Sequence, residues 1–339
     1  MARTAALPPS APFRDTASQL KDMLSGQLES TNQVILDHLA SSVPLIPEVA
    51  RHLIAAGGKR LRPLMTLAAA ELCGETGEGP RLLAGAVELI HAATLLHDDV
   101  VDESALRRGL RTANIVFGNK ESVLVGDFLF ARAFELMVRT GSIEVLGILS
   151  KASCIIAEGE VLQLTTSQNL ETPQTIYLDV ISAKTAALFA AAAEAGAVVA
   201  GGDAEKVAAM RAYGLNFGIA YQLVDDALDY QSSGAVLGKT AGDDFREGKM
   251  TLPVIRAYAA STSDEERQFW QRTIRDKDQR PDDFARANEL MRRDRIVEAC
   301  LQEARGYAEA AASSLAVFPV GDLRGTLEDL AIGSAERTT

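Results

Sequence analysis

Three aspartates stand close together in the stretch LLHDDVVDESALRRG, residues 95–109. If residues 80–102 form a helix, Asp98 and Asp102 occupy positions i and i+4 and project from one face. Two carboxylates placed there repel each other, and acids at a helix C-terminus also oppose the helix dipole. Most charge clusters are solvated helix ends. These acids, however, end an apolar run, so something positive is needed to offset both costs.

A second acidic cluster with the same D-D-x-x-D spacing follows in YQLVDDALDY. Its members are Asp225, Asp226 and Asp229, against Asp98, Asp99 and Asp102 in the first cluster. One such motif is common by chance, but two at the ends of long apolar helices are much harder to dismiss. Opposed carboxylates suit Mg²⁺, which takes one or two of them and completes its shell with water and phosphate oxygens. The two motifs therefore predict a phosphate ligand held through metal.

Two basic clusters stand out because the chain carries a formal net charge of -12. The stretch GGKRLRP contributes Lys59, Arg60 and Arg62 after two glycines that can bring backbone close to an anion, and RRGLR contributes Arg107, Arg108 and Arg111. Arginines that cap helix ends would explain either cluster alone. They do not explain both clusters beside two acidic motifs.

Two further residues have an open interpretation. His91 lies two helical turns before Asp98 on nearly the same face, although a lone histidine in an apolar helix is more often a core residue. Lys184 lies within VISAKTAALF, where an uncompensated buried lysine would be expensive. Its side chain must therefore face either water or an anion.

The composition indicates which elements position these residues. The 339 residues are 47% apolar but only 5% aromatic, and few segments alternate apolar and polar residues as strands do. Residues 172–201 read as one helix that begins at Thr172 and Pro173, and Asp203 reads as the cap of a helix that runs past Tyr230. Long helices with short glycine-bearing connections predict an all-α, single-domain antiparallel bundle. The Ala-rich stretch 186–195 would let a neighbouring helix approach closely.

Other features limit the organisation and the location of the chain. Residues 1–14 are expected to form a disordered tail, and residues 15–339 to form one helical domain. The acidic balance argues against binding to nucleic acid. Cys73, Cys154 and Cys300 have neither disulfide-framework nor zinc-site spacing, which suits a reducing cytoplasm. We expect no transmembrane segment, because the longest uncharged runs are rich in alanine and glycine and are interrupted by Glu194.

Together the motifs GGKRLRP, LLHDDVVDESALRRG, KT at 184–185, YQLVDDALDY and GKTAGDDFREGKMTLP resemble those of the trans-isoprenyl diphosphate synthase family, in the same order. The resemblance covers roughly residues 50–255. It implies a helical bundle around a deep central cavity, usually in a homodimer, with both aspartate motifs facing each other at the mouth. The implied substrates are isopentenyl diphosphate and an allylic diphosphate.

The resemblance also implies individual roles. Mg²⁺ ions, three of them with substrate bound, would be held by Asp98, Asp102 and Asp225, with Asp99, Asp226, Asp229 and Asp244 in support. The allylic diphosphate would be bound by Arg107, Lys184 and Lys239, with Lys249 nearby, and its reacting carbons would be lined by Thr185 and Gln222. Isopentenyl diphosphate would be held by Lys59, Arg62, His91 and Arg108. The C-terminal LAIGSAERTT matches the family only loosely, so Arg337 receives no role.

Product length is expected to depend on the residues four and five positions before the first motif, as it does in the family. These are Thr94 and Ala93, and both are small, which leaves the cavity open toward Ile90. A helix of some 30 residues spans about 40 Å and could line the cavity for a long prenyl chain, of about C40–C50. The stretch HAATLLHDDVVDES is most similar to octaprenyl, solanesyl and decaprenyl synthases, which make quinone side chains.

Several alternatives remain. The small residues could merely permit helix packing, and the product could then be the shorter farnesyl or geranylgeranyl diphosphate. A terpene cyclase also ionises an allylic diphosphate with Mg²⁺, but normally lacks the GGKRLRP site and the second D-D-x-x-D motif. A non-catalytic subunit of a heteromeric synthase tends to lose aspartates or basic residues, and none of the key positions is lost here.

Overall fold

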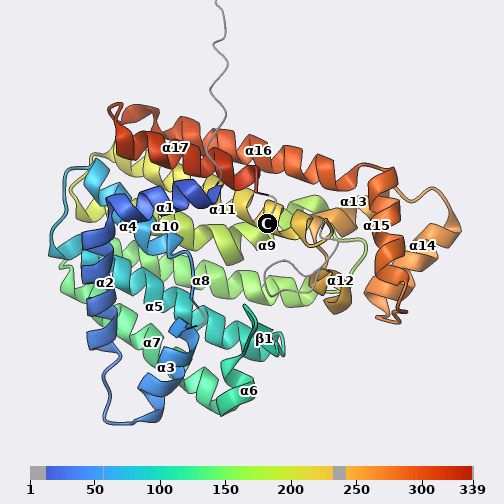
Figure 1. The fold of residues 1–339 in the computed structure, drawn as a ribbon, viewed down its shortest axis with the longest axis horizontal. Coiled ribbons are helices and arrows are strands. Elements are labelled where there is room, and N and C mark those ends of the chain that lie inside the picture. Colours follow the sequence, from blue (N-terminus) through green and yellow to red (C-terminus); the bar gives the residue numbers. More distant parts are fainter. Residues whose placement is uncertain (1–12, 56, 232–241, 338–339) are drawn as a thin grey trace, which may run out of the picture.

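The computed structural model describes residues 13–55, 57–231 and 242–337, and almost all of its regular structure is helical (Figure 1). The helices of the first half are α1 (Phe13–Met23), α2 (Ser25–His38), α3 (Leu45–Ala55), α4 (Leu61–Leu72), α5 (Glu78–Val101), α6 (Ala113–Phe117), α7 (Asn119–Arg139) and α8 (Ile143–Thr166).

The second half continues the bundle. Its helices are α9 (Gln174–Ile181), α10 (Ala187–Val199), α11 (Ala204–Leu228), α12 (Asp243–Glu247), α13 (Leu252–Ala259), α14 (Asp264–Trp270), α15 (Asp283–Arg293), α16 (Ile296–Ser314) and α17 (Asp322–Ala335), with π-helical turns at Ser182–Ala186 and Gln271–Arg275 and a 3-10 turn at Leu315–Val317. The predicted all-α fold is confirmed.

One small hairpin was not predicted. Strands β1 (Leu106–Arg107) and β2 (Leu110–Arg111) pair antiparallel directly after α5. The turn between them consists of Arg108 and Gly109, whose φ angles of 53° and 80° are both left-handed. A two-residue hairpin turn of this kind requires positive φ at both positions, which explains the glycine.

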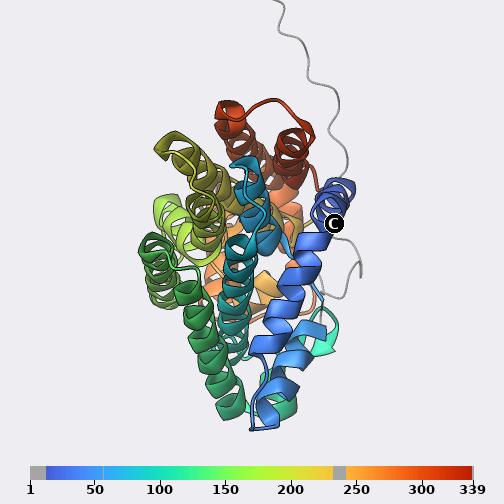
Figure 2. The same ribbon diagram turned by 90° about the vertical axis from the view of Figure 1, so that its left-hand side faces the viewer.

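Helix α5 lies in the interior of the bundle, with α7 on one side and α2 on the other (Figure 2). Its side chains Leu83, Val87, Ile90 and Ala93 are fully buried in a core shared with α7, α8 and α10. The helix was predicted over residues 80–102 and is observed from Glu78 to Val101. Asp102 is its C-cap residue and donates its N–H to the Asp98 carbonyl at 2.8 Å.

One helix was predicted over residues 172–201, and the chain is helical without a break from Gln174 to Val199. Helix α9 begins at Gln174, Pro173 takes the capping position, and Thr172 does not cap it. A π-helical turn, Ser182–Ala186, then separates α9 from α10. The i→i+5 bonding of such a turn has no signature in the composition, and π-turns inside helices are frequent at functional sites.

Helix α11 packs closely against α10 and the π-turn that precedes it. Its predicted cap is confirmed, because the Asp203 side chain accepts from the Lys206 N–H at 2.9 Å, but the helix ends at Leu228 and not beyond Tyr230. A Cβ at Gly214 would lie 2.4 Å from the Phe189 carbonyl oxygen, and a Cβ at Gly218 would lie 2.5 Å from the Cα of Ala186. The close approach expected for the Ala-rich segment is therefore present.

The N-terminal prediction needs one correction. Helix α1 begins at Phe13, so residues 13 and 14 belong to a helix and not to a tail, while residues 1–12 lie outside the described residues. Helix α1 packs against α17, which brings Phe13 next to Arg337 (Figure 1). The assignment of residues 15–339 to a single domain stays a prediction.

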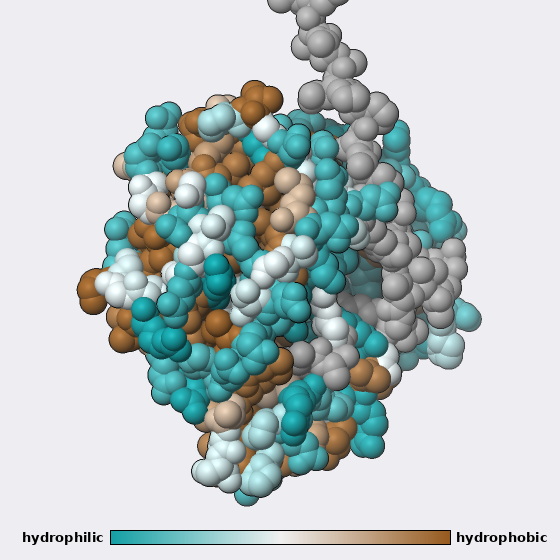
Figure 3. All heavy atoms as spheres, turned by 60° about the vertical axis from the view of Figure 1, so that its left-hand side comes forward, coloured by the Kyte–Doolittle hydropathy of each residue, from teal (hydrophilic) through white to brown (hydrophobic). Residues whose placement is uncertain are grey.

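Within the described ranges, one stretch, Gln174–Val199, is long and apolar enough to cross a membrane. Most of it is buried, and α10 packs against α4, α5, α8 and α11. This composition is therefore what a core helix requires. Figure 3 shows one face of the molecule, on which hydrophobic residues are interleaved with hydrophilic ones.

Candidate active site

The three aspartates of the first motif have different environments. Asp99 is buried, with 1% of its surface exposed, and accepts hydrogen bonds from Arg107 Nη2 at 2.7 Å and Nε at 3.1 Å. Its carbonyl also accepts from Asn114 Nδ2 at 3.0 Å. Asp99 therefore fixes Arg107 of the hairpin. Asp98 and Asp102 are the members of the motif suited to hold a cation.

Asp98 lies in an environment that disfavours its charge. The pKa of its carboxyl is raised to about 7, chiefly by burial and also by Glu160 and Asp102, while Lys184 and Arg107 oppose the rise. Lys184 donates to Glu160 Oε2 at 2.8 Å, so its side chain faces an anion of the protein itself. A divalent cation beside Asp98 would relieve the cost of this half-buried charge.

A chain of hydrogen bonds connects the π-turn to the second motif. Thr185 Oγ1 donates to Gln222 Oε1 at 2.9 Å, and Gln222 Nε2 donates to Asp226 Oδ1 at 2.7 Å. The hydroxyl of Tyr177 donates to Asp226 Oδ2 at 2.6 Å. Burial raises the pKa of Asp226 to about 6, although both hydrogen bonds oppose this rise. Sequence reasoning missed Tyr177, whose position two helical turns before Lys184 was the available signal.

These residues surround one cavity of about 140 Å³. Its lining includes Lys184, Thr185, Gln222, Asp226, Asp244 and Lys249, all predicted from the sequence. Burial lowers the pKa of Lys249, but Asp244 and Glu247 outweigh this and raise it above its usual value, with a contribution from Asp102. Lys249 in turn lowers the pKa of Asp226, so this lysine interacts electrostatically with one aspartate of each motif. Asp98, Asp102 and Asp225 are not among the described residues that line this cavity.

The rest of the second motif organises its surroundings. Asp229 Oδ1 accepts from the Gly242 N–H at 3.2 Å, and its Oδ2 accepts from the Asp244 N–H at 3.0 Å, so it anchors the start of α12. Asp225 accepts from Arg337 Nη1 at 2.9 Å. This ion pair places Arg337, which received no role from the sequence, next to the second motif.

The predicted diphosphate ligand Lys239 lies outside the described residues.

The first basic cluster is held by groups on α5. Arg60 pairs with Glu88, a residue that sequence reasoning missed. Arg62 is half-buried, and loss of solvation lowers its pKa to about 10. Its Nη1 donates to His91 Nε2 at 3.3 Å. Burial and then Arg62 lower the pKa of His91 well below its usual value, so the imidazole is neutral and accepts this bond. His91 is thus part of the cluster.

The second basic cluster meets the first at Gly58. A Cβ at that position would lie 3.0 Å from Arg108 Nη1, so the glycine lets the hairpin arginine lie against the loop that precedes α4. Arg108 also lowers the pKa of the half-buried Glu88. Lys59, Arg62, His91 and Arg108 are therefore gathered in one region.

The residues predicted to set product length lie inside the bundle. Ala93 and Ile90 have no exposed surface, and Thr94 is half-buried, with its hydroxyl bonded to the His91 carbonyl at 2.9 Å. Both buried residues belong to the core in which α7 and α8 also pack. Their influence on product length stays a prediction.

The carboxylates fit a metal that completes its shell from the substrate. In the described part of the chain, no group of three or more His, Cys, Asp or Glu side chains forms a metal site by itself. Mg²⁺ is usually bound by one or two carboxylates together with water and phosphate oxygens, and not by an all-protein cage. Asp98, Asp102 and Asp225 supply such hard oxygen donors.

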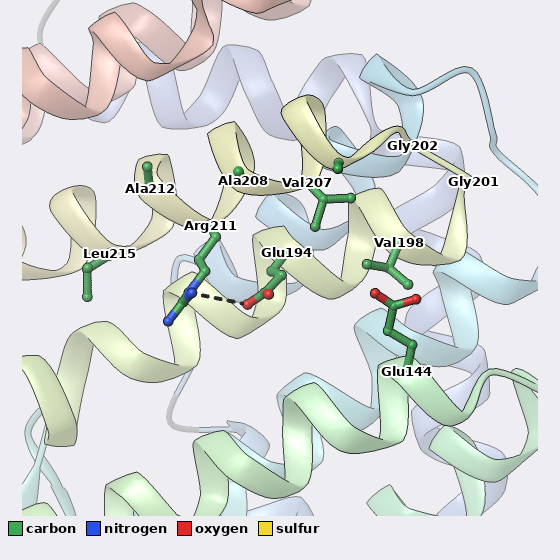
Figure 4. Close-up of a pocket in the computed structure, with 11 residues that line it drawn as sticks. Glu144, Glu194, Val198, Gly201, Gly202, Val207, Ala208, Arg211, Ala212 and Leu215 are labelled. Atoms are coloured by element: carbon green, nitrogen blue, oxygen red, sulfur yellow. Dashed lines mark ion pairs between the residues drawn. The ribbon is translucent and has the colours of Figure 1, made fainter.

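A larger groove of about 670 Å³ lies elsewhere, between α8, α10 and α11 (Figure 4). Arg211 lies 3.6 Å from Glu194 across it, and Glu144 faces it from α8. None of the predicted site residues lines this groove. Size alone is therefore a poor guide to the chemistry of this protein.

The family model for polyprenyl synthetase matches residues 43–291, so the chain belongs to this family. It is therefore a prenyltransferase, and its all-α bundle is the isoprenoid synthase fold.

Individual relatives agree. The chain is 44% identical over 247 residues to octaprenyl diphosphate synthase of Escherichia coli (strain K12), covering 73% of this chain and 76% of that protein. A polyprenyl synthase from Caulobacter crescentus CB15, complexed with calcium and isoprenyl diphosphate, has a TM-score of 0.92 at 52% identity, covering 98% of this chain and 100% of the other. A decaprenyl diphosphate synthase from Rhodobacter capsulatus has a TM-score of 0.91 at 50% identity, covering 95% and 99%.

Proposed function

We propose that the protein condenses isopentenyl diphosphate head-to-tail onto an allylic diphosphate and makes a long-chain all-trans polyprenyl diphosphate, of octaprenyl to decaprenyl length, for quinone side chains. The observation that carries this proposal is the cavity lined by Lys184, Thr185, Gln222 and Lys249, beside two aspartate motifs. The names of the relatives support the length, because octaprenyl and decaprenyl diphosphate synthases are among them.

The allylic half-site separates a diphosphate from a carbocation, and the residues are suited to that task. Three Mg²⁺ ions at Asp98, Asp102 and Asp225 would neutralise the diphosphate as it leaves. Arg107, Lys184 and Lys239 bind the same group through their positive charges, with Lys249 nearby. Thr185 and Gln222, joined by their hydrogen bond, orient the reacting carbons.

The second half-site holds the nucleophile. Lys59, Arg62, His91 and Arg108 bind isopentenyl diphosphate so that its double bond faces the cation. After the new carbon–carbon bond forms, a proton is lost to the departed diphosphate. No protein nucleophile is required, which agrees with a site built from carboxylates, cations and amides.

Three alternatives are less well supported. A shorter-chain synthase would use the same site, and only the floor of the cavity would differ. A terpene cyclase would have no use for the Lys59 to Arg62 cluster. A non-catalytic subunit would not need both aspartate motifs, yet both motifs and both basic clusters are present in this sequence. Mass analysis of the product from isopentenyl and farnesyl diphosphates separates these alternatives.

Lys59→Ala and Arg62→Ala test the separation of the two half-sites. Each is expected to raise the KM for isopentenyl diphosphate at least about tenfold, because a charge-assisted contact worth about 1.5–3 kcal/mol is lost. The KM for the allylic substrate should stay within about twofold. Lys151→Ala, an exposed lysine on α8, serves as the control. Equal rises in both KM values would mean that the two half-sites are not separate.

We further propose a homodimer formed through α7 and α8. These helices expose large apolar residues on repeating faces: Leu124 (67%) and Val138 (63%) on α7, and Ile143 (82%), Val161 (61%) and Leu164 (58%) on α8. The first pair is about four helical turns apart and Ile143 and Val161 are about five turns apart, so each set shares a face. Exposed apolar residues gathered on neighbouring helices are typical of protein interfaces.

The double variant Leu124→Asp, Leu164→Asp is expected to sediment as a monomer, whereas the parent sediments at twice 36.2 kDa. Val320→Asp, which changes a residue that is 93% exposed but lies before α17, should leave the dimer intact. A monomeric parent would refute the homodimer.

The three thiols support a reducing location, and we propose the cytoplasm. Cys73, Cys154 and Cys300 are all free in the structure.

A further inference from the structure

Four side chains from distant parts of the sequence meet beside Asp225. They are Phe13 of α1, Lys59 before α4, Tyr221 of α11 and Arg337 after α17. The ring centroids of Phe13 and Tyr221 lie 6.0 Å apart at an interplanar angle of 58°. The two rings thus form one aromatic surface contacted by two cations.

The geometry of each cation is that of a cation–π contact. Lys59 Nζ lies 4.6 Å from the Phe13 centroid and 5.8 Å from that of Tyr221. Arg337 Cζ lies 3.9 Å from the Tyr221 centroid and 5.3 Å from that of Phe13. All four distances lie within about 6 Å, the range in which the ring quadrupole attracts a cation.

Two members of this cluster are buried, and a third, Lys59, is exposed to solvent. Phe13 is 4% exposed and Arg337 is 8% exposed, whereas Lys59 is exposed. Arg337 is fixed by bonds from Nη1 to Asp225 at 2.9 Å and from Nη2 to the Tyr221 carbonyl at 2.8 Å. Two cations on one aromatic pair repel each other, and Asp225 offsets part of the charge of Arg337. A further anion beside Lys59 would reduce the remaining repulsion.

We propose that Phe13 and Tyr221 are positioning residues for isopentenyl diphosphate, because they hold Lys59 and Arg337 toward its diphosphate. The inference rests on the proposed function of Lys59. A free lysine side chain has considerable rotamer entropy, and a ring that restricts it before binding reduces the entropy lost when the anion arrives. Helix α1 is thereby a part of the substrate site, through a residue that never touches the substrate.

The test is Phe13→Leu, which keeps an apolar side chain but removes the ring. We expect the KM for isopentenyl diphosphate to rise about tenfold, equivalent to about 1.4 kcal/mol. The kcat and the KM for the allylic substrate should stay within about twofold. Phe13→Tyr keeps a π face and should restore the KM. Tyr221→Leu should repeat the effect of Phe13→Leu, and Tyr221→Phe should not.

A purely structural role for Phe13 predicts a different pattern. Leu20 is 1% exposed on the same helix and has no aromatic ring to offer a cation, so Leu20→Ala should lower the melting temperature without changing the KM for isopentenyl diphosphate. If Phe13→Leu behaves like Leu20→Ala, or if Phe13→Tyr fails to restore the KM, the inference is wrong. Lys59→Ala separates this failure from a larger one: if it too leaves the KM unchanged, the proposed substrate site itself is wrong.

Discussion

Replacing Asp98 or Asp225 with alanine is expected to lower kcat by at least about 10³-fold, since preorganised electrostatic groups in active sites contribute effects of that size. Neither side chain is a core contact: Asp225 is 42% exposed, and Asp98 lies at the end of α5. The circular dichroism spectrum should therefore be unchanged. Turnover of isopentenyl and farnesyl diphosphates at saturating Mg²⁺ is the measurement, and a chelator should produce the same loss in the parent.

Asp98→Asn adds a stability readout to this prediction. The pKa of Asp98 rises from an ordinary value of 3.8 to about 7, so the folded state binds the extra proton between those limits. Ionisation of Asp98 therefore destabilises the metal-free fold progressively as pH rises from about 4 to about 7. With chelator at pH 8 the variant should melt above the parent, and the difference should shrink toward pH 4.

Asp22→Ala, at an exposed position of α1, is the control for both readouts. Near-normal turnover in both Asp98→Ala and Asp225→Ala with Mg²⁺ present would refute the two-motif metal site.

Ala93→Tyr is expected to change the product and not the reaction. The residue has no exposed surface and lies less than two helical turns before Asp98, in a core where added volume is not absorbed by neighbours. The growing chain should meet the ring early, so the main products should shorten to about C15–C20, because an overpacked interior leaves less room for the chain. The rate per condensation should stay within about tenfold of the parent, which corresponds to about 1.4 kcal/mol.

Mass analysis of the products decides this prediction. Ala299→Tyr, at an exposed position of α16, is the size-matched control and should keep the product of the parent. If Ala93→Tyr makes chains as long as the parent does, residue 93 does not face the cavity. If the parent itself stops at geranylgeranyl diphosphate, the long-chain product is wrong but the prenyltransferase activity stands.

The fold and much of the site could be predicted because their signals are local. Acidic motifs at helix ends, glycines after Val199 and the cap at Asp203 are each read within a few residues. The contacts that were missed depend on tertiary structure. Arg337 meets Asp225 across 112 residues, and Tyr177 meets Asp226 across 49. No local pattern reports which helix faces will meet, so these partners appear only once the bundle is assembled.

The π-turn at Ser182–Ala186 holds one residue more than an α-helical turn would. In a regular helix each residue turns the chain by about 100°. Loss of one residue from this turn would therefore let it close into regular α geometry while α9 and α10 kept their relative orientation. Closing the turn without losing a residue would instead rotate α9 relative to α10 by about 100°, and Tyr177 would leave Asp226 while Thr185 stayed beside Gln222. The contact between Tyr177 and Asp226 thus depends on the geometry of this turn as well as on the two residues themselves.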